Sequence, residues 1–88
     1  MIITLEVGRK YLIKSTSSDL YHEIEIIKFR GQLLCFDLPH DKSGFRTWVK
    51  FESSEKSNPR IFWQSLEFEV IDQLSGPNAT ESETHENL

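Results

Sequence analysis

Catalytic chemistry in this sequence would depend on one cysteine and a few histidines. Cys35 with His22 or His40 has the composition of a nucleophile and its base. Cys35, however, lies inside an apolar run that is typical of a buried strand, and no residue pattern marks a site for a developing oxyanion. We therefore interpret Cys35 as a small buried apolar residue, and we predict that the protein is not an enzyme.

Metal and phosphate sites are equally weakly indicated. His40 and Asp41 follow Asp37 closely, but oxygen and nitrogen ligands at such short spacing are common in solvated loops. The four glycines, at positions 8, 31, 44 and 76, are too dispersed to form a phosphate-binding loop. We expect no metal and no cofactor.

The clearest candidate for a binding surface is the segment 45–51, in which polar and apolar residues alternate. If its phenylalanines face a core, then Arg46, Trp48 and Lys50 stand together on the opposite face. An indole beside two cations suits stacking on a nucleic-acid base or anchoring in the pocket of a protein partner. Arg60 and Trp63 would extend this surface if their strand pairs with 45–51. The alternative is that Trp48 covers a second small core, shielded by basic side chains.

The element around which the chain is organised is a predicted hairpin over 21–38. Two runs rich in β-branched and aromatic residues flank Arg30-Gly31-Gln32, where Gly31 suits a turn with positive φ. The adjacent pair Ile26-Ile27 breaks the alternation of the first run. Such a break predicts either a strand buried on both faces or a β-bulge that redirects its second half.

Further strands are expected on both sides of this hairpin, separated by polar loops. We predict strands over roughly 10–14, 45–51 and 61–63 and a last strand through residue 71, with 2–7 as a short leading strand or a packed arm. Residues 64–66 are predicted to form a single 3₁₀ turn. Residues 1–74 would make one small β-barrel domain, and residues 75–88, with Glu81, Glu83 and Glu86, a flexible acidic tail.

Composition limits the classes of partner. The formal charge is −4, of which the tail carries three units, so the predicted domain is nearly neutral and has no overall field that attracts nucleic acid or membranes. No apolar run approaches the roughly 20 residues that span a bilayer, and the start lacks the features of a signal peptide. We expect a soluble cytoplasmic protein.

Five or six short strands with a short 3₁₀ turn near 64–66 predict an all-β fold, a small and strongly bent antiparallel barrel. In this order, and in the phrases Val7–Tyr11 and Trp63–Ile71, the chain resembles small SH3-like and Tudor-like accessory proteins of bacteria and their viruses. The runner-up fold is an OB-type barrel. A Tudor-like aromatic cage would draw on Tyr21, Trp48 and Trp63.

The missing catalytic groups, the nearly neutral domain and the flexible acidic tail favour a non-enzymatic module that binds or modulates a larger protein. The alternative is a single-stranded nucleic-acid binder that uses Arg46, Trp48, Lys50, Arg60 and Trp63. Dimerisation through an exposed edge of the 21–38 hairpin is a further expectation.

Overall fold

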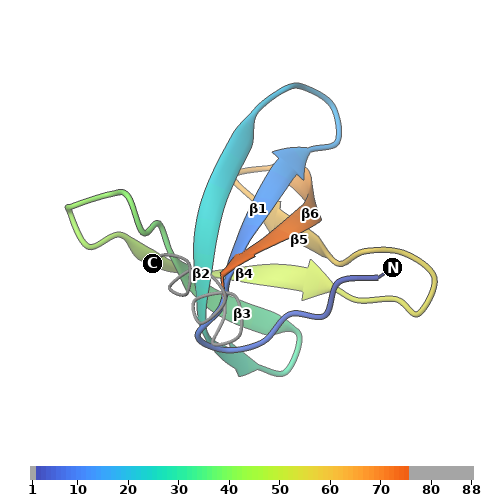
Figure 1. Ribbon diagram of the computed structural model, residues 1–88, viewed down its shortest axis with the longest axis horizontal. Helices are drawn as coiled ribbons and strands as arrows, with labels where there is room; N and C mark the ends of the chain where they lie inside the picture. The colour runs from blue at the N-terminus through green and yellow to red at the C-terminus, as the bar shows by residue number, and fades with distance from the viewer. Residues whose placement is uncertain (1, 76–88) are drawn as a thin grey trace, which may run out of the picture.

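The computed structural model describes residues 2–75. It is a closed barrel of six antiparallel strands that follow one another around the barrel in chain order (Figure 1). The strands are β1 Lys10–Ser15, β2 Tyr21–Arg30, β3 Leu33–Asp37, β4 Arg46–Glu52, β5 Arg60–Trp63 and β6 Leu66–Ser75. Pairing of β1 with β6 closes the barrel. The all-β barrel is therefore confirmed, and the OB-type alternative is wrong because that fold has Greek-key order.

The strands form in segments rich in β-branched and aromatic residues, and in β1 it is burial that alternates along the strand. Tyr11, Ile13 and Ser15 are buried, and the residues between them are partly exposed. Inward-facing side chains from all six strands fill the interior with one core, although β3 buries Leu34, Cys35 and Phe36 in succession. Its buried members are Tyr11, Ile13, Ile24, Ile26, Leu34, Phe36, Val49, Ile61, Phe68 and Val70.

The N-terminal arm, residues 2–9, closes one end of the barrel without forming a strand, so the packed-arm prediction is the correct one. Ile3 and Leu5 pack against the core. The Ile3 amide donates a hydrogen bond of 2.8 Å to Asn58 Oδ1, and the buried Tyr11 hydroxyl accepts one of 2.8 Å from the Glu6 amide. Figure 1 shows the arm in dark blue beside the loop 53–59.

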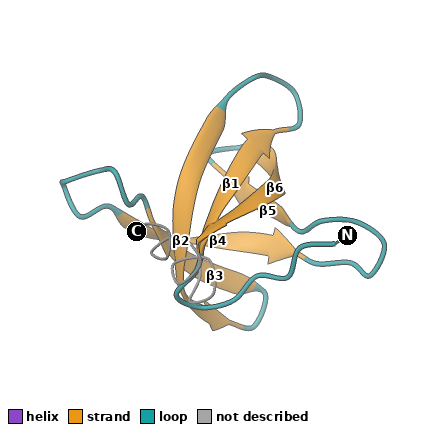
Figure 2. Cartoon of the chain, in the orientation of Figure 1, coloured by secondary structure: helices purple, strands orange, loops and turns teal. Residues whose placement is uncertain are grey.

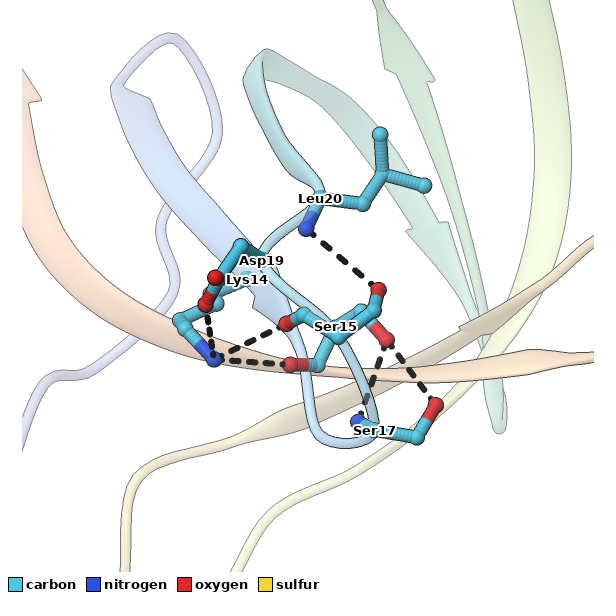
Figure 3. Close-up of polar contacts among 6 residues, drawn as sticks. Lys14, Ser15, Ser17, Asp19 and Leu20 are labelled. Carbon is cyan, nitrogen blue, oxygen red and sulfur yellow. Dashed lines mark hydrogen bonds and ion pairs between the residues drawn. The ribbon is translucent and has the colours of Figure 1, made fainter.

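The loop between β1 and β2 is held by its own polar groups, as its serine-rich sequence predicts. Lys14 Nζ donates to the carbonyl oxygens of Ser15 and Ser18 at 3.2 and 2.9 Å. The buried Ser15 hydroxyl accepts from the Ser17 amide at 3.2 Å. Figure 3 shows these contacts of Lys14 and Ser15.

The two tight hairpins differ in how well the sequence signals them. Gly31 has φ +59° in the turn between β2 and β3, as predicted. The predicted 3₁₀ turn at 64–66 is wrong: Gln64 and Ser65, at φ 56° and 65°, form a two-residue turn, and Leu66 already belongs to β6. Positive φ at both central residues defines a type I′ turn. The sequence does not signal this turn, because the usual central pair is Asn-Gly and here it is Gln-Ser. Figure 2 shows only strands and loops among the described residues.

Because Gln64 and Ser65 carry Cβ atoms in the left-handed region, this turn stores strain. Replacing the pair by Gln64→Asn with Ser65→Gly is expected to raise the free energy of unfolding by about 1 kcal/mol. Urea denaturation followed by circular dichroism measures the change. The control Ser43→Gly lies at a loop position without positive φ, where glycine only adds freedom to the unfolded chain. If the free energy of unfolding rose equally in the turn variant and in Ser43→Gly, the assignment of strain to the turn would be contradicted.

Residues 76–88 lie outside the described part of the chain, and so does nearly all of the predicted tail. The last strand is longer than predicted, since β6 continues to Ser75. No helix among the described residues has the length and apolar character needed to cross a membrane.

Candidate functional site

A β-bulge in β2 decides which side chains reach the outer surface. Ile26 pairs with Phe36 and Lys28 with Cys35, so Ile27 is the extra residue. Without it, the alternation that buries Ile24 and Ile26 would turn Lys28 and Arg30 toward the core. The bulge exchanges the two faces, so Phe29 pairs with the buried Leu34 while Lys28 and Arg30 stand outside.

On the outer face, β2, β3 and β4 place these cations beside Trp48. Cys35 lies between Lys28 and Trp48 in the register, and Leu33 lies between Arg30 and Lys50. The Arg30 guanidinium carbon is 5.2 Å from the Trp48 ring centroid, and Lys28 Nζ is 5.8 Å from it. Both lie within the range of cation–π attraction. We call Lys28, Arg30, Trp48 and Lys50 the Trp48 patch.

The patch keeps its positive charge available. Among residues 2–75, no ion pair includes Lys28, Arg30 or Lys50. Trp48 remains 37% exposed although it rests on the sheet. Three uncompensated cations around an accessible indole form a surface that attracts an anion and offers it an apolar edge.

Two of the predicted cations are instead neutralised by neighbours. Arg46 donates two hydrogen bonds to the carboxylate of Asp37, at 2.7 and 3.1 Å, and these raise the pKa of Arg46 above its ordinary value. Arg60 lies 3.2 Å from Glu67 in a second ion pair. Both side chains are exposed, but their charge is already balanced by a carboxylate. Of the residues predicted for the binding surface, Lys50 and Trp48 therefore contribute most to the Trp48 patch.

Trp63 is not brought to this surface. Its ring stands edge-on to the buried Phe36 with centroids 5.2 Å apart, and it contacts Phe45 and Phe68. His22 covers it with an edge contact at 5.0 Å. The prediction that Trp63 enlarges the binding face is therefore not supported by its position, because odd and even residues of β5 point to opposite sides of the barrel wall.

The other chemical candidates lie in separate surroundings. Cys35 is 2% exposed, which agrees with its interpretation as a buried residue. His40 shares a hydrogen bond of 2.8 Å with Glu23, while Tyr21 lies beneath Lys14. The three aromatic residues considered for a cage thus contact different neighbours. Within residues 2–75, no three histidine, cysteine, aspartate or glutamate side chains are grouped as a metal site would require.

Sequence reasoning missed Lys28 and Arg30 although it noted the signal that positions them. The Ile26-Ile27 pair predicted either a strand buried on both faces or a bulge, and the structure shows the bulge. What the sequence does not contain is the register that sets Lys28 beside Cys35 and Cys35 beside Trp48. The sequence signal for this part of the surface was that Lys28 and Arg30 lie two residues apart after the bulge, and so on the same face of the strand.

Comparisons of this chain with models of known protein families, with curated proteins and with solved structures find no match. The fold is therefore established only as a small six-stranded antiparallel β-barrel, from its own strand pairing.

Proposed function

We propose that the protein is a non-enzymatic interaction module that binds an acidic segment of a larger protein through the Trp48 patch. The observation that carries this proposal is the exposed Trp48 beside Lys28, Arg30 and Lys50, three cations without an ion pair among the described residues. Cations that neighbouring strands of one sheet hold close together attract carboxylates more strongly than isolated cations do. Aromatic residues with arginine also form the usual anchors of protein interfaces.

The likeness to SH3-like modules supports the same function. The barrel is small, antiparallel and closed, and its candidate surface lies on the outside of strands rather than in an enclosed cavity. We propose that the protein works as such modules do, as a rigid barrel that presents one side-chain patch to a partner; this implies no common ancestry. Dimerisation through the hairpin remains a prediction, and β3, paired on both sides, offers no free edge for it.

A single-stranded nucleic acid is the second candidate, because an aromatic ring with cations is also the chemistry of such binders. Two observations make it the weaker one. Arg30 and Lys28 lie over the Trp48 ring, where a base would have to stack. The formal charge of −4 repels a polyanion at long range, whereas a short acidic segment meets mainly the local patch.

Reversing one charge of the patch tests the proposal. Arg30→Glu is expected to weaken binding of a glutamate-rich synthetic peptide about tenfold or more, because an attraction becomes a repulsion. Amide NMR titration of labelled protein at low salt measures the affinity and locates the shifts. Lys42→Glu, in the exposed loop between β3 and β4, is the matched control with the same change of net charge.

Two results would count against the acidic-peptide proposal. Equal weakening in both variants would show that only net charge matters. A mixed-sequence single-stranded oligonucleotide that binds more tightly than the peptide, with the larger shifts at Trp48, would establish the second candidate instead.

A further inference from the structure

The barrel end next to the Trp48 patch carries an open groove lined by apolar and polar residues in similar measure. Its lining comes from the N-terminal arm, from the ends of β2 and β4, and from the loop 53–59, and its volume is about 610 Å³. Phe29 and Phe51 are its aromatic lining residues, with ring centroids 5.4 Å apart. Ile2 and Phe29 keep 39% and 36% of their surface exposed there. Apolar side chains left open to water in this way are typical of a binding surface.

The groove and the patch are connected along the surface. A second hollow of about 460 Å³ is lined by the turn Gly31-Gln32, by Lys50, and by Phe51 and Ser53, which also line the groove. Gln32 is fixed against β4, because its carbonyl accepts a hydrogen bond of 3.1 Å from the Phe51 amide. The two hollows therefore adjoin at the end of β4, between Lys50 and Phe29.

Charge differs along this path. Arg30 and Lys50 lie on the patch side, whereas Glu52 borders the second hollow and Glu55 borders the groove on the side of the loop 53–59. Carboxylates of a ligand are attracted toward the first pair and repelled by the second. An uncharged apolar side chain suffers no such repulsion in the groove.

We propose that the groove receives one large apolar side chain of the same acidic segment whose carboxylates bind the Trp48 patch. This inference rests on the proposed function and specifies its ligand: a protein segment in which an apolar anchor is flanked by Asp or Glu. The charge complementarity of the patch and its continuity with the groove select this occupant. The apolar residue supplies affinity by burial, and the carboxylates set the orientation.

Two synthetic peptides test the inference on the full chain. One is glutamate-rich with a single leucine, and the other has serine in place of the leucine. We expect the leucine peptide to bind about tenfold more tightly, since burial of one such side chain supplies at least that factor. Amide NMR should show shifts at Lys28, Arg30, Trp48 and Lys50 with both peptides, and at Leu5, Phe29 and Phe51 only with the leucine peptide.

A groove-filling variant provides the control. Ser53→Phe places an aromatic ring at an exposed position of the lining and should abolish the advantage of the leucine peptide while leaving the serine peptide unaffected. Ser43→Phe adds the same ring in the loop 38–45, which Figure 1 shows on the opposite side of the barrel from the loop 53–59, and should change neither affinity.

The outcomes separate the two proposals. If both peptides bind equally, with shifts confined to the patch, the groove inference is wrong and the proposed function stands. If neither peptide binds, both are wrong. If replacing Glu81, Glu83 and Glu86 by glutamine moves the amides of the groove without any peptide, the occupant is the chain's own C-terminal segment, and the assignment to a partner is overturned.

Discussion

Trp63→Ala is expected to lower the free energy of unfolding by about 3 kcal/mol or more, a large share of the stability of a domain this small. Trp63 fills one end of the barrel, where it contacts Phe36, Phe45 and Phe68. Alanine would leave a cavity between rings that strand pairing holds in place. Urea denaturation monitored by circular dichroism measures the loss.

Trp48→Ala is the matched control, because it removes the same side chain from the outer face. We expect a loss of about 1 kcal/mol, from two cation–π contacts and the cover over Cys35. Peptide binding should show the opposite order, with Trp48→Ala the more damaging variant. Equal losses of stability would contradict the separation of a structural tryptophan from a surface one.

Tyr11→Phe is expected to lower the free energy of unfolding by about 2 kcal/mol at neutral pH. The fully buried Tyr11 accepts a hydrogen bond from the Glu6 amide at 2.8 Å and donates one to the Thr4 carbonyl at 3.0 Å. Phenylalanine keeps the ring but leaves both arm groups without this partner. Denaturation in urea at pH 7 measures the difference, and Tyr21→Phe, at a tyrosine that is 47% exposed, should have little effect.

The same hydroxyl makes stability depend on pH in the alkaline range. Burial, the largest influence, raises the pKa of Tyr11 above its ordinary value of 10.0. A raised pKa in the folded state means that the contribution is intact below pH 10 and declines above it, as the unfolded tyrosine ionises first. The stability difference between wild type and Tyr11→Phe should therefore shrink above pH 10. A difference that stays constant from pH 7 to pH 11 would contradict this assignment.

The strand pattern of the chain could be predicted because it follows from local alternation. The hairpin at 21–38, its turn at Gly31 and the alternating segment 45–51 all appear where the pattern places them. The turn at Gln64-Ser65 was predicted wrongly, because tertiary pairing of β5 with β6 imposes positive φ on residues that do not favour it.

The candidate site could be predicted only in part. Trp48 and Lys50 follow from the alternation of one strand, and the structure places both on the outer face. Lys28 and Arg30 come from another strand, and their position depends on the bulge at Ile27 and on the register of β3 between them and Trp48. The Ile26-Ile27 pair in one segment indicates the bulge, but no single segment encodes the register of β3 between β2 and β4.

By itself, then, the sequence determined a small all-β chain with a central hairpin, because side-chain shape and period-two burial act between near neighbours. The tertiary structure alone decided which end of the barrel Trp63 fills, which cations Asp37 and Glu67 neutralise, and which remain around Trp48. These outcomes depend on closure of the barrel, which sets residues distant in sequence opposite one another. A shift of one residue in that register would exchange inside for outside.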